Sequence, residues 1–317
     1  MPALLQLEPL YDPRVWGGQR LKPSPEKPIG EAWVVYECNP IAGGPYAGRT
    51  LAEIAAERGA ALVGRQAFER TGTRFPLLIK LLDCADWLSI QVHPNDEQAI
   101  RLEGAGQFGK TEAWHVLEAE KGAQLIAGVR PGTSSAELAQ AIRNGSIEAC
   151  AQYHTVHAGD TIFMPAGLMH ALGPGLLLYE VQQTSDLTYR VFDWNRPASA
   201  GRPLHIEQSV AVTNPQLAGK TMPLPPLAAH DQRPLVRCSY FDLSLLVSQQ
   251  DPLQLDTQGE SFHALTVIEG KAEVVCKDEQ VTLGRFETVL VSADAGGYSL
   301  SPLAPCRTLC ARVPPEG

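Results

Sequence analysis

Residues 159–170 read Gly-Asp-Thr-Ile-Phe-Met-Pro-Ala-Gly-Leu-Met-His, and this stretch carries the strongest signal for the fold. The pair Gly159-Asp160 is typical of a tight turn, and residues 161–164 form a short apolar run that suits a strand. Pro165 and Gly167 predict a second tight turn, after which His170 begins the next strand with its side chain pointing inward. A histidine that follows a turn is more often structural than functional. Its fixed spacing from Gly159, Pro165 and Gly167 favours a site.

The rest of the chain predicts a mainly β protein with a few short helices. Gly (28) and Pro (25) together make up about a sixth of the 317 residues, against an average share of roughly 12%, which indicates many tight turns. Helix starts are predicted by three capping boxes, Thr50/Glu53, Asn95/Gln98 and Ser134/Glu137. Strands are predicted from short apolar runs at 77–82, 87–92, 123–129, 161–165 and 176–183.

The chain is long enough for two domains. Residues 193–205 and 214–234 are rich in Pro, Gly and small residues, so we interpret them as linkers. Short β-type runs follow, and the step at residues 268–271 predicts a hairpin between two of them. We therefore expect one domain over residues 1–225, which carries the site, and a C-terminal β domain over residues 226–317 without a metal.

Charge and cysteine content restrict the partners and the compartment. The formal net charge is −9, which disfavours nucleic acid and anionic membranes as partners but leaves a small anion possible. The seven cysteines are odd in number and have no C-x-x-C spacing, which favours free thiols in a reducing compartment. The N-terminus does not resemble a signal peptide, and no apolar run is long enough to span a bilayer. We expect a cytoplasmic protein.

Two further segments offer candidate ligands. Gln91 and His93 alternate on a predicted strand, so their side chains share a face. A hydrogen-bonded polar pair is the alternative interpretation. Lys110 and Glu112 share a face in the same way; a buried carboxylate there would need a cation or a metal, whereas an exposed Lys/Glu pair would need neither.

Residues 179–194 are unusually polar for a segment that follows an apolar strand, which indicates either a solvated loop or the wall of a site. Glu180 and Arg190 belong to this segment, and Arg190 stands between Tyr189 and Val191.

The candidate ligands are the imidazoles of His93 and His170, the carboxylate of Glu112 and the amide oxygen of Gln91, which together form a ligand set without sulfur. Such a set suits Zn²⁺, with Fe²⁺ or Mn²⁺ as alternatives.

Taken together, these motifs make the chain similar to the mannose-6-phosphate isomerases, in their short bacterial form. The 159–170 stretch resembles the second metal-binding motif of the cupin barrels, although Pro174 stands where the usual pattern ends in Asn. The similar segments extend from near the N-terminus to about residue 205. They are 16–18, 29–33, 76–82, 88–94, 109–114, 165–173 and 180–194.

The resemblance implies two cupin barrels of jelly-roll type, of which only the first binds metal. It implies one Zn²⁺ per chain, held by His93, Glu112, His170 and, least firmly because an amide is a weak ligand, Gln91. It also implies that Arg190 is catalytic. The pocket for a sugar phosphate would include four residues, Ser89, Lys80, Lys110 and Glu180.

The implied reaction interconverts mannose 6-phosphate and fructose 6-phosphate through an enediol. Arg190 would stabilise negative charge, since a guanidinium is too basic to remove a proton easily. Glu180, Asp186, Lys110 and a zinc-bound water all remain candidates for the base. Two other classes of protein remain open: another metal-dependent cupin enzyme, such as an oxygenase or sugar epimerase, and a cupin that binds a sugar phosphate without catalysis. The sequence leaves the oligomeric state open.

Overall fold

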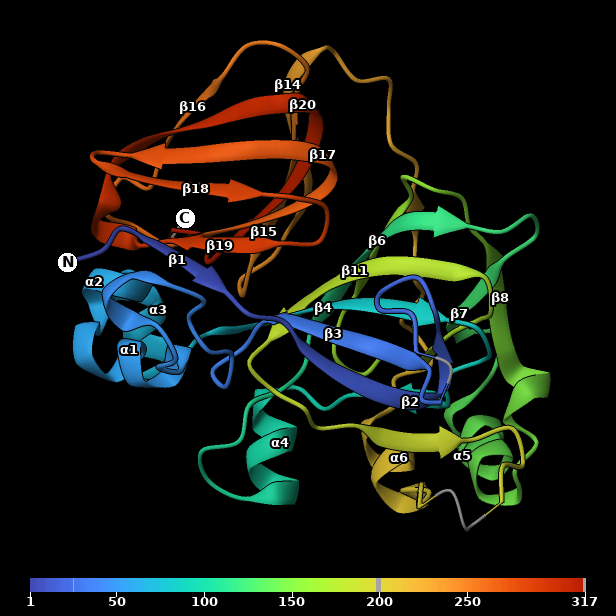
Figure 1. Cartoon of the computed structure of the whole chain (residues 1–317). Coiled ribbons are helices and arrows are strands. Elements are labelled where there is room, and N and C mark those ends of the chain that lie inside the picture. The colour runs from blue at the N-terminus through green and yellow to red at the C-terminus, as the bar shows by residue number, and fades with distance from the viewer. Residues whose placement is uncertain (25, 198–200, 316–317) are drawn as a thin grey trace. The chain divides into compact units, whose positions relative to one another are not determined.

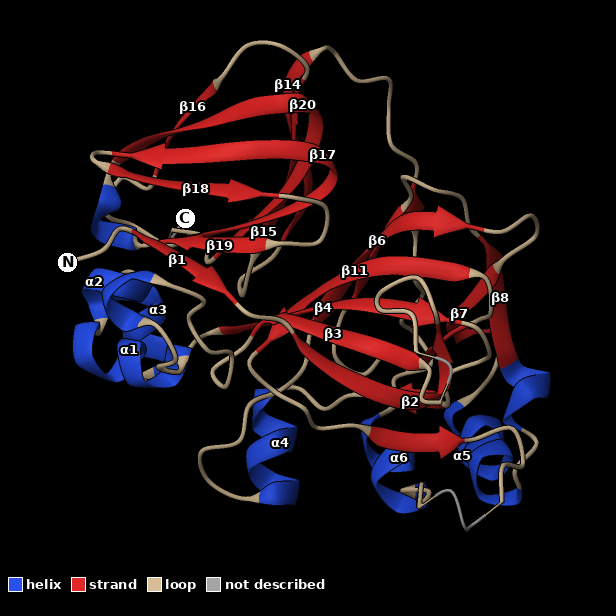
Figure 2. Ribbon diagram, viewed as in Figure 1, coloured by secondary structure: helices blue, strands red, loops and turns tan. Residues whose placement is uncertain are grey.

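The computed structural model describes residues 1–24, 26–197 and 201–315, and the chain forms two compact units. We call Asp12–Glu31 with Leu82–Leu224 the central unit, and Met1–Tyr11, Ala32–Leu81 and Pro225–Gly317 the terminal unit. Figure 1 labels the helices and strands of both units, and Figure 2 shows that strands predominate in each. The prediction of a mainly β protein with a few helices is confirmed.

The terminal unit is built around an antiparallel sheet of eight strands. Six of them pair in the order β1-β19-β17-β20-β15-β14, while β16 pairs with β20 and β18 with β17. Their bounds are β1 Leu4–Leu7, β14 His230–Arg237, β15 Asp242–Ser248, β16 Leu253–Asp256, β17 His263–Cys276, β18 Glu279–Leu283, β19 Thr288–Val291 and β20 Gly297–Arg312. The terminal unit also contains three short helices, which lie between β1 and β14 in the sequence: α1 Leu51–Arg58, α2 Ala60–Val63 and α3 Arg65–Thr71.

The division of the chain differs from the one expected from the sequence. The break at Leu224/Pro225 lies within one residue of the expected boundary, but residues 1–11 and 32–81 belong to the terminal unit as well. For residues 1–11 the cause is the register of strand β1, in which Leu4 pairs with Val291 and Leu7 with Thr288 of β19. A pairing between such distant segments leaves no local signal in the sequence.

The hairpin expected at residues 268–271 is wrong. Strand β17 runs without reversal from His263 to Cys276, and its pairing with β20 shifts register around Glu269 and Lys271. Gly270 has a φ of 77°, and a Cβ there would lie 2.0 Å from the carbonyl oxygen of Pro305. Gly270 therefore lies at an irregularity within one long strand, at a point where the backbones of β17 and β20 approach closely.

The central unit contains one complete sheet of five strands, in the order β12-β5-β10-β7-β8. A second sheet has seven strands in the order β13-β9-β6-β11-β4-β2-β3, and β2, β3 and β4 each cross from one unit to the other. The bounds of the first sheet are β5 Ile90–Val92, β7 Gln124–Val129, β8 Ala151–Thr155, β10 His170–Leu172 and β12 Tyr189–Phe192. Those of the second are β2 Leu10–Gly18, β3 Ile29–Val35, β4 Leu77–Cys84, β6 Glu112–Ala119, β9 Thr161–Met164, β11 Leu176–Gln183 and β13 Thr221–Met222.

The two sheets of the central unit face each other across a shared core. Trp114 and Ile162 from the seven-stranded sheet pack in one buried cluster with Leu125 and Leu172 from the five-stranded sheet. The pairings run as open series among the described strands, so a sandwich with a jelly-roll-like character describes the unit better than the closed barrel expected from the sequence. The space between facing sheets is where inward side chains of both can meet.

The helices begin where their capping boxes predict. Thr50, Asn95 and Ser134 each accept a hydrogen bond from the backbone three residues on, ahead of α1, α4 (Asp96–Glu103) and α5 (Ser135–Asn144). The helix α6 (Ile206–Val212) was not expected. Short 3₁₀ turns lie at Gly44–Tyr46, Ile147–Cys150 and Ala293–Ala295. No helix in the described residues is long and apolar enough to cross a membrane.

Candidate metal centre

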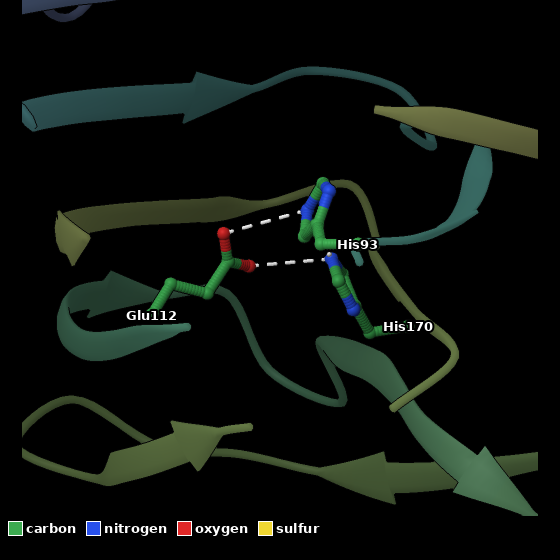
Figure 3. A group of neighbouring side chains, drawn as sticks. All are labelled: His93, Glu112 and His170. Carbon is green, nitrogen blue, oxygen red and sulfur yellow. Dashed lines mark hydrogen bonds and ion pairs between the residues drawn. The ribbon is translucent and has the colours of Figure 1, made fainter. Parts of the chain in front are cut away.

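Three buried side chains from separate strands converge between the sheets of the central unit. His93 follows β5, Glu112 opens β6 and His170 opens β10. Figure 3 shows the carboxylate facing both imidazoles. The Nε2 atoms of the two histidines are 3.1 Å apart, and the Glu112 oxygens lie 3.5 Å from His93 Nε2 and 3.2 Å from His170 Nε2. These residues could hold a metal ion.

The backbone sets the direction in which each imidazole points. Nδ1 of His93 lies 2.8 Å from the carbonyl oxygen of Leu187, and Nδ1 of His170 lies 2.8 Å from that of Leu168. A carbonyl oxygen only accepts, so each Nδ1 carries the hydrogen, and the Nε2 lone pairs face the centre. Hydrogen bonding of the outer nitrogen in this way orients histidines that bind metals.

The electrostatics of the cluster also suit a bound cation. Burial, followed by the charge of Lys110, lowers the pKa of His170 to about 4, so its imidazole is neutral at pH 7. Neither oxygen of Glu112 has a hydrogen-bond partner among the described residues, although Lys110 Nζ forms an ion pair at 3.2 Å. A buried carboxylate beside two nitrogen lone pairs is costly without a further positive charge. The structure therefore fits a divalent metal better than it fits an ordinary polar core.

Gln91 lies beside this trio but presents its nitrogen. Its Nε2 is 3.3 Å from Nε2 of His170, with which it is paired in register. The oxygen and nitrogen of an amide can be exchanged by a flip about the last side-chain bond, which would turn the oxygen to the centre. The expected ligand role of Gln91 thus stays a prediction that depends on this flip.

Lys110 and Glu180 form a polar wall next to the centre. Burial opposes the charge of Lys110, but Glu112, Glu180 and Asp186 more than compensate and raise its pKa. Glu180 pairs in register with Trp114, whose Nε1 donates a hydrogen bond of 2.8 Å to Oε2 of Glu180. Lys110, Glu112, Trp114 and Glu180 are buried, whereas Asp186 is exposed, so the polar 179–194 segment has a buried end at Glu180 and an exposed turn at Asp186.

Arg190 reaches the same face of the five-stranded sheet. It pairs in register with Gln91, which pairs in turn with His170, and directly opposed residues of antiparallel strands project to one side. Its Nη1 donates to the carbonyl oxygen of Pro203 at 2.9 Å. Burial, followed by the charge of Arg202, lowers its pKa from the usual high value. The backbone carbonyl of Pro203 therefore holds the Arg190 guanidinium. Strand β12, which carries Arg190, is separated from β10, which carries His170, by β5 alone.

The structure adds a residue that the sequence interpretation missed. Arg202 lies in the segment expected to be a linker, yet its Nε donates to Oδ2 of Asp193 at 2.8 Å and its Nη2 lies 3.4 Å from Oγ of Ser89. Residues 198–200 of that segment lie outside the described residues. Besides burial, the charge of Arg202 helps to lower the pKa of Arg190. The Pro- and Gly-rich sequence around Arg202 is typical of a linker, so it did not indicate a site residue at this position.

Lys80 is the one expected site residue outside the central unit. It is buried in the terminal unit, where its Nζ lies 4.8 Å from the ring centroid of Trp33. Its expected role in the sugar-phosphate pocket stays a prediction.

A cupin-like β protein with a buried His/Glu/His centre is the class that this fold and site define. Residues 4–115 match the family model described as phosphomannose isomerase type I, catalytic domain. The chain is 31% identical to the mannose-6-phosphate isomerase ManA of Bacillus subtilis (strain 168), across 95% of this chain and 97% of that protein. It is 40% identical to the mannose-6-phosphate isomerase of Streptococcus mutans serotype c, across 67% and 68% of the two chains. The chain belongs to the mannose-6-phosphate isomerase family.

Solved structures agree with this assignment. The crystal structure of the mannose 6-phosphate isomerase from Bacillus subtilis is similar with a TM-score of 0.84 and 28% identity, covering 98% of this chain and all of that one. A zinc-bound mannose 6-phosphate isomerase is similar with a TM-score of 0.78 and 16% identity, covering 98% and 100%. At that identity, the second likeness shows the fold alone.

Proposed function

We propose that this chain interconverts mannose 6-phosphate and fructose 6-phosphate with one Zn²⁺ held by His93, Glu112 and His170. The observation that carries the proposal is the buried Glu112 carboxylate, which has an ion pair with Lys110 but no hydrogen-bond partner among the described residues and lies within 3.5 Å of two imidazole nitrogens. When bound, the metal would supply Lewis-acid polarisation of substrate oxygens. Relatives that carry the name mannose-6-phosphate isomerase support this substrate.

The chain's own cations would bind and orient the sugar phosphate. Arg190, Arg202 and Lys110 are cations in the central unit, and a phosphate dianion needs charge-assisted hydrogen bonds of this kind. Arg190 would stabilise the negative charge that develops on the enediol oxygen. Ser89, placed by Arg202, would contact a substrate hydroxyl.

Proton transfer between the two sugar carbons requires a base within the same wall. Glu180 is buried, and its carboxylate accepts a hydrogen bond from the indole of Trp114. This hydrogen bond fixes the position from which the carboxylate would take a proton from a sugar carbon. Glu112 is the poorer candidate because it would be occupied by the metal. We also propose a cytoplasmic location, which the seven unpaired cysteines support.

A coupled assay tests the activity directly. Metal-loaded protein should convert fructose 6-phosphate to mannose 6-phosphate, a chelator should abolish the activity, and Zn²⁺ should restore it. His170→Ala should lose both bound zinc and activity. His157→Ala is the matched control, because that histidine's side chain is 80% exposed and it should leave both unchanged. Zinc-loaded protein that leaves both sugar phosphates unaltered would overturn the proposal.

A further inference from the structure

The terminal unit contains a polar cavity, lined by residues of β14–β17 and β20 and of the turn after β16. Its volume is about 750 Å³, which is within the range of small-molecule sites. The lining follows the strand register. Gln232 of β14 pairs in register with Leu246 of β15, and Leu255 of β16 pairs with Tyr298 of β20; Leu246, Leu255 and Tyr298 pack in one cluster. These side chains share one face of the eight-stranded sheet, so the cavity is a feature of the sheet itself.

A histidine without a complete set of partners faces this cavity. His263 is 5% exposed, and its Nδ1 lies 2.7 Å from the hydroxyl of Tyr298. Its Nε2 is buried and has no hydrogen-bond partner among the described residues. Burial, followed by the charge of Arg312, lowers the pKa of His263 to about 4, so the ring is neutral at pH 7. A neutral imidazole with one satisfied nitrogen leaves one polar atom for a ligand.

The charge in the lining disfavours a phosphate. Because His263 is neutral, Arg312 is the only cation among the described lining residues, and it forms an ion pair of 3.3 Å with Asp242. Asp256 adds a carboxylate to the lining. A dianion would therefore meet a neutralised guanidinium and a negative charge.

The remaining polar lining consists of amides and hydroxyls, which donate and accept equally well. They are Gln232, Gln254, Gln258, Ser244, Ser299 and Tyr298. Leu246, Leu255 and Val275 provide apolar surface beside them. This combination matches a small molecule with several hydroxyl groups and a hydrocarbon face.

We infer that the cavity of the terminal unit is a second binding site, which takes a neutral polyhydroxylated molecule such as a free sugar or a sugar alcohol. His263 Nε2 and the Tyr298 hydroxyl contact the ligand, and the glutamine amides bind further hydroxyls. The cavity shares no lining residue with the metal centre, and the inference does not depend on the proposed isomerase activity.

Methyl-labelled full-length protein, loaded with metal, tests this inference by nuclear magnetic resonance. Mannitol, mannose and mannose 6-phosphate are titrated while the methyl signals of Leu246, Leu255 and Val275 are followed. We expect saturable shifts with mannitol or mannose and weaker binding of the phosphate at these methyls. Because Leu246 and Leu255 line the cavity, shifts of their methyl signals report binding there.

Tyr298→Phe keeps the ring and removes the hydroxyl, so it should weaken binding about fivefold to tenfold. Gln232→Leu should weaken it similarly, while isomerase activity stays unchanged in both variants. Arg307→Gln, on the same strand but outside the lining, is the matched control. The inference is overturned if neither neutral probe produces saturable shifts, if both variants bind as tightly as the natural chain, or if the phosphate binds best.

Discussion

Removing the metal should lower the thermal stability of the central unit by a predictable amount. A ligand that binds only the folded state at 100 times its dissociation constant stabilises that state by about 2.7 kcal/mol. For a domain of 150–250 residues, each kcal/mol shifts the melting temperature by roughly 2–4 °C. All three proposed ligands lie in the central unit, so chelation should lower its melting temperature by about 5–11 °C.

The assay combines a thermal melt with hydrogen exchange. Zinc-loaded and chelated samples are compared at equal protein concentration, and exchange is followed in peptides that contain His93, Glu112 and His170. Chelation should speed exchange in these peptides more than in strands β17 and β20 of the terminal unit. His170→Ala should melt at the same temperature with and without zinc. An unchanged melting temperature on chelation, or an equal change in His170→Ala, would refute the reasoning.

Three other predictions follow from named contacts. Trp114→Phe removes the indole N–H that donates to Glu180 and leaves a smaller ring at a fully buried position, so stability should fall by about 1–3 kcal/mol in urea unfolding from the lost hydrogen bond alone, and isomerase activity should fall with it. Gly270→Ala should destabilise the terminal unit by at least about 1–3 kcal/mol, since its Cβ would meet the Pro305 carbonyl at a positive φ. His263 has a depressed folded pKa, so its contribution to stability should be full above pH 6.5 and decline towards pH 4.

Each of these predictions has its own control. Gly296→Ala also carries a positive φ but meets nothing within 4 Å, so it should cost less than Gly270→Ala; an equal cost would contradict the steric argument. His263→Leu should remove its share of the pH dependence between pH 4 and 6.5. Arg312 and Asp256 are the charges acting on this histidine, and an identical pH profile in the variant would assign the dependence elsewhere. For Trp114→Phe, full activity would exclude a role for the indole in placing Glu180.

Local signals in the sequence predicted much of the fold, and the structure brings His93, Glu112 and His170 together. A capping box needs only four residues, which is why the starts of α1, α4 and α5 are all confirmed. The 159–170 stretch predicted two turns and a strand beginning at His170, and the structure has that strand at His170–Leu172. Alternation along strands placed Lys110 and Glu112 on one face, where they form an ion pair.

The features that the sequence analysis predicted wrongly or missed depend on contacts between distant segments of the chain. Gly270 belongs to a continuous strand and not to a hairpin because Pro305, on another strand, approaches it. Arg202 was overlooked because its meaning comes from Asp193 and Ser89, whereas its immediate neighbours resemble a linker. The amide orientation of Gln91 depends on His170, and the position of an amide within a strand does not determine it.

The pairing of β1 with β19 imposes an order on synthesis. Leu4 leaves the ribosome long before its partner Val291, by about 15–60 s at 5–20 residues per second. During that time strand β1 cannot pair with β19, because β19 has not yet been synthesised. Residues 82–224 of the central unit are synthesised before β19. A message cut short before residue 288 would release a chain whose first strand lacks the strand it pairs with. Such a product would expose an unpaired edge, which quality-control proteases and chaperones can recognise.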